Sequence, residues 1–276
     1  MPDIFNYSFM VNAVIAGVLA SIAFGIVGTY VVVKRIVFIS GGISHTAYGG
    51  IGLGYLLGFD PMLGAAGFSV IAAFFISGMR KHKSGREDTL IGIMWAFGMA
   101  LGVMFINLAP GYAPNLMSYL FGNILTVPSS ELIMMFVLDI IILSLVLIFF
   151  NEFRAITFDE SFARVIGLPV DNLYLLLLVI IALTTVLLIK VVGIILVIAL
   201  LSTPAAISIN YVKSLKSMMI LSIALGLFFT ISGLLLSYYL NLSSGATIIM
   251  VAVISYLISN LLTHLQKKRK SKLRSA

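Results

Sequence analysis

The chain has 276 residues, of which 61% are hydrophobic and 10% are charged, and its mean hydropathy is +1.16. Soluble domains carry roughly 25% charged residues, so this composition excludes a soluble globular protein and indicates an integral membrane protein. Cysteine is absent, which excludes disulfides, thiolate metal sites and cysteine nucleophiles. The first residues lack the positive region and cleavage site of a signal peptide, so the first apolar segment is expected to remain as a span.

Charged residues divide the chain into apolar segments of transmembrane length. Residues 119–127 are apolar but too short to cross, and we expect them to form a re-entrant or interfacial turn that ends at Pro128. The remaining pattern predicts an all-α membrane protein, a polytopic bundle of about nine spans. The expected spans are 9–33, 36–57, 61–79, 89–109, 131–150, 173–189 and 191–210, with two more between 216 and 267 that are separated by a turn at 241–245.

The basic residues predict the orientation of these spans. With nine spans, sixteen of the seventeen Lys and Arg residues fall on one side, and only Lys190 falls on the other. Loops rich in Lys and Arg stay in the cytoplasm, which predicts a protein of the cytoplasmic membrane with its N-terminus outside and its C-terminus inside. The charge of +7 therefore reflects membrane orientation and not nucleic-acid binding. We expect one transmembrane domain at 1–266, with a polar cytoplasmic loop at 151–172 and a basic, flexible cytoplasmic tail at 267–276.

His45 is an ionisable residue inside the second expected span. On a helix its neighbours include Gly41, Gly42 and Gly49, so the imidazole stands on a face with almost no side chains. Two interpretations remain open. Either the glycines let another helix pack closely and His45 makes one interhelical hydrogen bond, or the face, with Ser44, lines a solute pathway. Neutral imidazole suits zinc and other divalent transition metals, so the pathway interpretation predicts a metal ligand.

Two further residues inside spans have two interpretations each. Asp139 either pairs with a buried partner that holds helices together or supplies a second metal-binding oxygen to the pathway. Pro204 interrupts the 191–210 span and is either a packing kink or a hinge for gating. The small residues of 50–54 and 98–102 are expected to form helix contacts within the subunit.

Several common motifs are absent from the chain. It has no phosphate-binding loop, no His-Glu-x-x-His pair and no regularly spaced intramembrane charges. We therefore expect a transport protein and not an enzyme, and one that takes its energy from another subunit.

Four motifs carry a resemblance to a known family. They are Ile-Ser-His-Thr-Ala-Tyr-Gly at 43–49, Ser-Tyr-Leu-Phe-Gly-Asn-Ile-Leu at 118–125, the stretch that ends in Leu-Leu-Ser-Thr-Pro-Ala-Ala at 192–206, and the Gly-Leu-Leu-Leu-Ser-Tyr-Tyr-Leu-Asn stretch at 233–247. With them, the chain resembles over nearly its whole length the membrane subunit of bacterial and archaeal ABC importers for zinc, manganese and iron.

The resemblance implies partners and a coupling site. The 159–169 stretch is similar to the loop by which this family docks into its ATPase subunit. The implied assembly is a homodimer of this chain with two ATPase subunits and an extracytoplasmic metal-binding protein, working by alternating access. No permanently bound cofactor is implied, and the transported ion would be zinc first, then manganese or iron. The candidate coupling residues are Asp159, Glu160, Ala163, Gly167 and Pro169.

The chain departs from the family pattern at two positions. Many relatives have an Asp four residues before the pathway His, where this chain has Gly41, and an acid before the last span is replaced here by Asn241. A metal site at His45 would then need the dimer mate's His45, Asp139 or backbone oxygens.

Three other functions remain as alternatives. An ABC permease for cobalamin or an iron chelate would need a wide path and no metal-ligating His. A secondary carrier or channel would work without an ATPase, and a structural scaffold would carry no flux.

Overall fold

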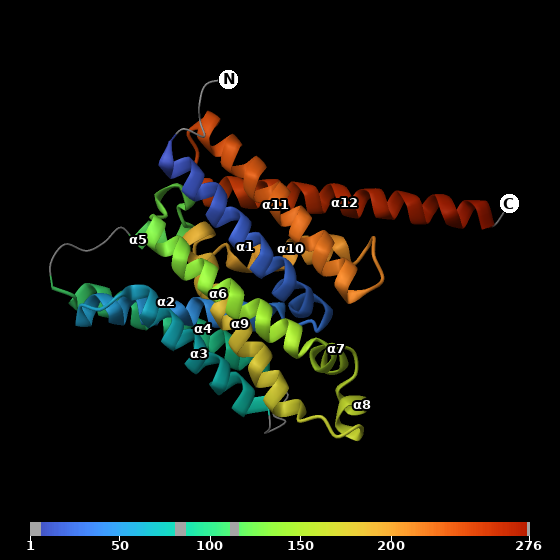
Figure 1. Ribbon diagram of the computed structural model, residues 1–276, viewed down its shortest axis with the longest axis horizontal. Helices are drawn as coiled ribbons and strands as arrows, with labels where there is room; N and C mark the ends of the chain where they lie inside the picture. The colour runs from blue at the N-terminus through green and yellow to red at the C-terminus, as the bar shows by residue number, and fades with distance from the viewer. Residues whose placement is uncertain (1–6, 81–86, 111–115, 275–276) are drawn as a thin grey trace.

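The computed structural model describes residues 7–80, 87–110 and 116–274, and every regular element in these ranges is a helix (Figure 1). Four helices, α5, η2, α7 and α8, have nine residues or fewer and are too short to cross a membrane, and α10, with 12 residues, is shorter than a typical span. The helices are α1 Ser8–Val33, α2 Val37–Leu57, α3 Pro61–Arg80, α4 Glu87–Leu108, α5 Leu116–Phe121, η2 Ile124–Thr126, α6 Ser129–Ile148, α7 Phe150–Phe158, α8 Glu160–Val165, α9 Val170–Val192, α10 Val197–Ser208, α11 Leu215–Leu240 and α12 Ser244–Arg274.

Within the described residues, seven helices are long and apolar enough to cross a membrane, namely α1, α3, α4, α6, α9, α11 and α12. The expected spans at 9–33, 36–57, 61–79 and 89–109 match α1 to α4 to within two residues at each end. The helix α2 has the length of a span, 21 residues, but its glycines and polar residues dilute its apolar character. The structure therefore confirms a polytopic helical membrane protein.

The boundary expected between the spans at 173–189 and 191–210 lies a few residues later in the structure, and α10, at Val197–Ser208, is shorter than the expected second span. The helix α9 runs on to Val192, and the chain then turns at Gly193, whose φ of +79° is strained for any residue with a Cβ. The N–H groups of Ile194 and Ile195 donate to the carbonyls of Tyr119 and Leu120, at 2.9 and 3.2 Å. The break is stable because the segment around α5 satisfies its backbone.

The 119–127 segment forms only the short helices α5 and η2 before Pro128 begins α6, which confirms that it does not cross. Between α5 and η2, Gly122 has a φ of +67°, and a Cβ on it would lie 2.4 Å from the N atom of Gly193. A Cβ on Gly245 would lie 2.1 Å from the carbonyl oxygen of Phe121. Three of the four family-like motifs thus meet at one glycine junction, formed by Gly122, Gly193 and Gly245.

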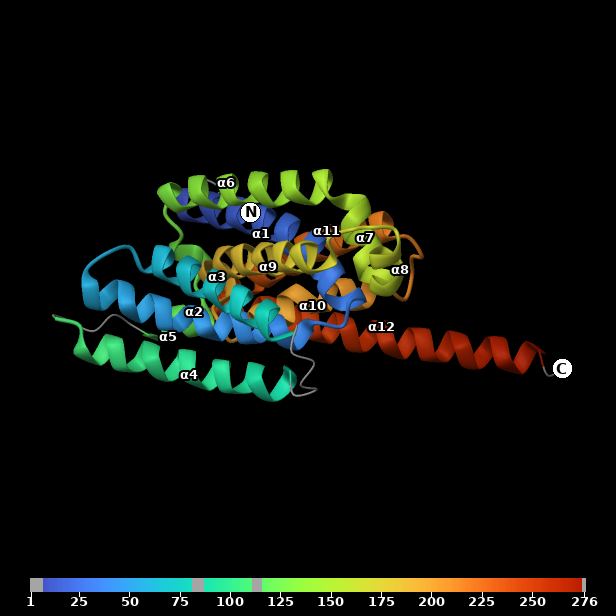
Figure 2. The same cartoon turned by 90° about the horizontal axis from the view of Figure 1, so that it is seen from below.

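The helix α9 lies at the centre of the bundle. It contacts α1, α2, α3, α6 and α10, and Figure 2 shows it between α6 on one side and α2 and α4 on the other. Around it, α1 packs on α10 and α11, and α2 packs on α3 and α4. The contacts of α2 are backbone to backbone, since a Cβ on Gly50 would lie 2.0 Å from the Gly64 oxygen and one on Gly52 would lie 2.5 Å from the Gly102 oxygen. These contacts confirm that the small residues pack helices within the subunit.

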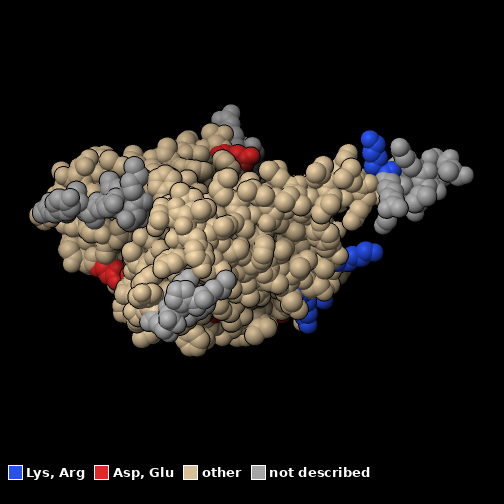
Figure 3. All heavy atoms as spheres, turned by 90° about the horizontal axis from the view of Figure 1, so that it is seen from above, with Lys and Arg blue, Asp and Glu red and all other residues tan. Residues whose placement is uncertain are grey.

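Two polar regions are more ordered than the sequence suggested. The loop expected at 151–172 contains α7 and α8, and the tail expected to be flexible continues α12 as a helix to Arg274. Lys, Arg and Gln are good helix formers and no Gly or Pro interrupts the tail, which explains its helix. In Figures 1 and 2 α12 projects from the bundle, and Figure 3 shows a largely uncharged face with Lys and Arg atoms at the end toward which α12 projects.

Candidate functional site

His45 is buried between α2 and α4. Its side chain is 4% exposed, and its ring stacks on Trp95 of α4 with the ring centroids 3.8 Å apart and an angle of 16° between the planes. Neither ring nitrogen has a hydrogen-bond partner in the part of the chain that the structure describes. The neighbouring Ser44 hydroxyl donates to the backbone oxygen of Gly41 at 2.9 Å, so it is satisfied within α2. A buried imidazole without a partner costs free energy, and that cost favours a functional role over a packing role.

The glycine face around His45 is covered by side chains of neighbouring helices. A Cβ on Gly41 would lie 2.5 Å from Ile198 Cδ1, and one on Gly49 would lie 3.0 Å from Phe68 Cε1. A solute can reach His45 only if these side chains move. The pathway role of Gly41, Gly42, Ser44 and Gly49 stays a prediction. The covering residues are Ile198 and Trp95 at Gly41, Ile91 at Gly42, and Phe68 at Gly49.

Asp139 lies in a different group of helices from His45. It is 3% exposed on α6, which packs mainly on α1 and α9, whereas α2 packs mainly on α3 and α4. Both of its carboxyl oxygens lack a hydrogen-bond partner among the described residues. No group of three or more His, Asp or Glu side chains in the described ranges is placed to hold a metal ion. The role of Asp139 as a second pathway oxygen therefore stays a prediction.

Pro204 lies inside α10, where its carbonyl accepts a hydrogen bond from the Ser208 hydroxyl at 2.8 Å. The strongest break in this region is at Gly193 and not at Pro204. The hinge role of Pro204 stays a prediction.

The short helix α8 is shaped by the residues predicted for coupling. The Asp159 side chain caps its start by accepting the Phe162 N–H at 2.9 Å. Gly167, with a φ of +82°, follows its end, and the Leu168 N–H returns to the Ala163 oxygen at 3.0 Å, as in a Schellman motif. Ala163 is fully buried and fixes the inner face of α8.

Glu160 points inward from α8, toward the ends of two long helices. One carboxyl oxygen pairs with Lys34, next to the end of α1, and the other pairs with Arg80 at the end of α3. Burial by itself would raise the pKa of Glu160, but the hydrogen bonds from Lys34 and Arg80 outweigh it and lower the pKa below its usual value of 4.5. Glu160 is therefore a carboxylate at neutral pH. Pro169, the fifth predicted coupling residue, is exposed and precedes α9.

The outer face of this segment is apolar, which the sequence reasoning missed. Phe158, Phe162, Val165 and Ile166 are 64%, 57%, 85% and 52% exposed. Their spacing of four, three and one along a polar loop is the signal that could have found them, because it places them on one side of a helical segment. Exposed apolar patches next to polar residues mark interaction sites.

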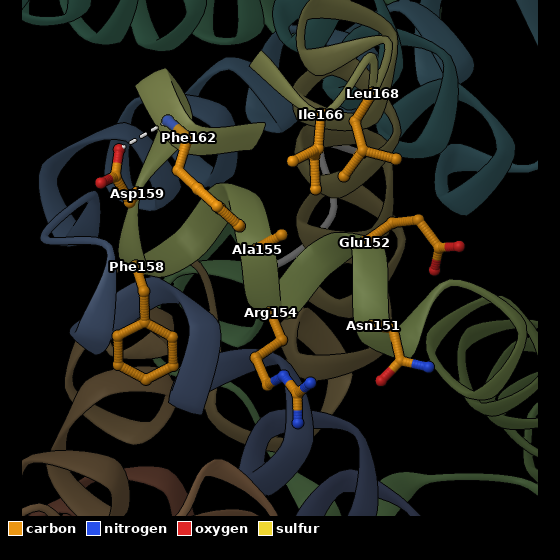
Figure 4. A pocket seen from close by; sticks show the side chains of 9 residues that line it. All are labelled: Asn151, Glu152, Arg154, Ala155, Phe158, Asp159, Phe162, Ile166 and Leu168. Atoms are coloured by element: carbon orange, nitrogen blue, oxygen red, sulfur yellow. Dashed lines mark hydrogen bonds between the residues drawn. The ribbon is translucent and has the colours of Figure 1, made fainter. Parts of the chain in front are cut away.

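A hollow of about 470 Å³ lies beside this apolar face. Figure 4 shows its lining, which comes from α7 and from the segment that contains α8. The hollow combines apolar rings with charged groups at its edge, a composition that suits a protein partner. It is lined by Asn151, Glu152, Arg154, Ala155, Phe158, Asp159, Phe162, Ile166 and Leu168.

Comparisons with known proteins identify the family. Residues 6–263 match the family described as the ABC 3 transport family. A membrane protein of Synechocystis sp. described as uncharacterized is 51% identical over 94% of this chain and 92% of its own length. The manganese transport system membrane protein MntC of Listeria monocytogenes is 35% identical over the same shares of the two chains, 94% and 92%. The solved structure of PsaBC from Streptococcus pneumoniae in complex with Fab is 34% identical, covers 92% of both chains and has a TM-score of 0.85.

ABC permeases are multi-pass proteins of the cytoplasmic membrane and leave ATP hydrolysis to a separate subunit, which agrees with the apolar helices of this chain and with the absence of a phosphate-binding loop. The chain belongs to the ABC 3 transport family, and its relatives include membrane proteins of metal and manganese transport systems.

Proposed function

We propose that this chain is the permease of an importer that carries a divalent transition-metal ion inward by alternating access. It would act as a homodimer with two ATPase subunits and would receive the ion from an extracytoplasmic binding protein. The observation that carries the proposal is α8: a capped helix in a polar loop that exposes Phe162, Val165 and the adjoining Ile166 beside a hollow. An ATPase subunit is the partner that a permease of this family requires at such a helix.

We assign the metal contact to His45 and rank manganese before zinc. The sequence by itself ranked zinc first, but the Listeria relative is named for manganese. Imidazole accepts either ion, whereas manganese prefers additional oxygen ligands. With Gly41 in place of an acid, those oxygens would come from Asp139, from backbone carbonyls or from the second copy of the chain.

The proposed topology has nine spans, with the N-terminus outside and α8 in the cytoplasm. It counts α2 and α10 with the seven long apolar helices. Its support is that Lys34 and Arg80, both predicted to be cytoplasmic from the charge pattern, lie at the same end of the bundle as α8. Cysteines introduced singly at exposed Ser161 and at exposed Asn241 test it, because only the second should react with an impermeant thiol reagent added outside whole cells.

The transport test uses proteoliposomes that hold this chain with its ATPase subunit and binding protein. Manganese, zinc and iron uptake are measured with and without internal ATP, for the wild type and for His45→Ala. We expect ATP-dependent uptake of manganese that falls at least about ten-fold in the variant, because a transit ligand lowers the barrier for a desolvated ion. The matched control is His264→Ala, which removes an exposed histidine of α12.

Two results would contradict this proposal. Uptake that needs no ATP would show that the chain is a carrier or channel and not the permease of an ATP-driven importer. Uptake of a chelate or cobalamin that persists in His45→Ala would turn it to an organometallic permease.

A further inference from the structure

The carboxylate of Glu160 joins parts of the chain that are far apart in the sequence. Its two oxygens pair separately, one with the Lys34 ammonium and the other with Arg80 Nη2. The Lys34 ammonium also donates to the backbone oxygen of Ile156 in α7, at 2.6 Å. Glu160 of α8 therefore binds Lys34 and Arg80 at the ends of α1 and α3, and Lys34 also binds α7.

This contact is shielded from water. The side chain of Lys34 is 7% exposed, and those of Glu160 and Arg80 are 25% and 28% exposed. The ring of Tyr174, on α9, lies 4.1 Å from Arg80 Cζ and 5.5 Å from Lys34 Nζ. Charge-assisted hydrogen bonds in such surroundings are stronger and less screened than exposed ones. We call these four residues the Glu160 cluster.

A second ion pair near α8 provides a contrast. Arg164 donates to Asp171 at 2.6 Å, but these side chains are 55% and 41% exposed. Exposed ion pairs contribute little, and this one joins α8 only to the adjacent start of α9. The Glu160 cluster is instead a partly buried connection from α8 into the long helices.

Both cations of the cluster lead to α2, the helix that carries His45. Lys34 lies in the short connection between α1 and α2. Arg80 ends α3, and α3 touches α2 backbone to backbone where a Cβ on Gly50 would lie 2.0 Å from the Gly64 oxygen. Lys34 therefore gives a displacement of α8 a short route to α2, and Arg80 gives it a longer route along the continuous helix α3 to Gly64.

We propose that Glu160 is a positioning residue that fastens α8 to α1 and α3, so that ATP-driven displacement of α8 moves α2 and opens the covered face at His45. This inference rests on the proposed function and adds to it the residue that transmits the movement. It also gives Glu160 a role inside the permease and not on the ATPase surface. Without the cluster, α8 would turn about its own ends, which are the extended Asp159 and the positive-φ Gly167.

The test uses the complete complex in proteoliposomes and compares Glu160→Gln with the matched control Asp171→Asn. Three quantities are measured: the ATPase subunit retained on purification, ATP hydrolysis, and manganese imported per ATP. We expect Glu160→Gln to retain the ATPase subunit and most hydrolysis, while manganese imported per ATP falls about ten-fold, within the usual range of coupling between sites. Asp171→Asn should match the wild type in all three.

A second pair of variants keeps the test decisive if Glu160→Gln does not fold. Arg80→Gln cuts only the connection to α3 and leaves Lys34 paired, and Arg80→Lys keeps the charge. We expect Arg80→Gln to lower manganese imported per ATP about five-fold and Arg80→Lys to restore most of it.

Each remaining outcome has one meaning. Loss of the ATPase subunit from Glu160→Gln would overturn the inference and make Glu160 a docking residue. An unchanged ratio of manganese to ATP in both Glu160→Gln and Arg80→Gln would also overturn it. A wild-type complex that imports no metal would instead overturn the proposed function.

Discussion

His45 is a buried imidazole that side chains of neighbouring helices cover. It stacks on Trp95, and Ile198 fills the space beside Gly41. An aromatic stack contributes about 1 kcal/mol beyond its buried area, which is small enough for a driven rearrangement to break it. The covering side chains are thus suited to act as a barrier that opens during transport.

Trp95 is the only tryptophan of the chain, so its fluorescence reports on this barrier. We expect manganese, added to the purified complex, to shift the tryptophan emission of this chain to longer wavelength, because an ion that binds His45 must move the indole into more polar surroundings. Tryptophans of the other subunits are replaced by Phe for the measurement. His45→Ala should show no shift, and a shift of the same size in that variant would place the metal elsewhere.

At the scale of elements, the glycine junction explains why α9 and α10 are separate helices. Gly193 has a positive φ, and a Cβ on it would lie 2.3 Å from the N atom of Gly122 and 2.4 Å from the oxygen of Leu120. An irregular turn between two membrane helices is stable where a neighbouring segment satisfies its backbone, as the segment around α5 does here.

Gly193→Ala should destabilise the protein by about 3 kcal/mol, because the positive φ and the backbone clash both add cost. The matched control is Gly58→Ala, where φ is +75° but no atom lies within 4 Å of the added Cβ, and its cost should be about 1 kcal/mol. Unfolding of the purified protein in detergent measures both. Equal losses in the two variants would show that the contact between α5 and the α9–α10 break does not constrain the fold.

The residues of α8 and of its two ends have different roles. Asp159, Ala163 and Gly167 shape the helix, and Glu160 ties it to α1 and α3. The side chains that remain available to a partner are the apolar ones, above all Val165 at 85% exposure.

At the scale of the whole molecule, most exposed apolar residues lie on helices long enough to face lipid. The segment around α8 instead gathers four exposed apolar side chains in a polar loop at one end of the bundle (Figure 1). An apolar surface outside the lipid is stable only when a partner covers it. The apolar surface around α8 therefore supports the proposed docking of an ATPase subunit there.

Val165→Glu should weaken the association with the ATPase subunit at least about ten-fold, because it places an unpaired charge in an apolar contact. Retention of the ATPase on the immobilised permease measures the effect. Gln266→Glu, on the exposed side of α12, adds the same charge away from α8 and should leave retention unchanged. Normal retention by Val165→Glu would exclude Val165 from the docking surface.

The sequence by itself determined the membrane class, the first four helices and the short non-crossing segment before Pro128. These features depend on local composition and on apolar length. The packing of α2 through Gly50 and Gly52 was also predictable, because small residues at helical spacing permit close approach.

Only the tertiary structure decided which residues meet. It packed the turn between α9 and α10 against the segment around α5, covered His45 with Trp95 and Ile198, and placed Asp139 in another helix group. It also turned Glu160 away from the surface and toward Lys34 and Arg80. These outcomes depend on contacts between residues that are tens to more than a hundred positions apart, and no local pattern records which helix face such contacts select.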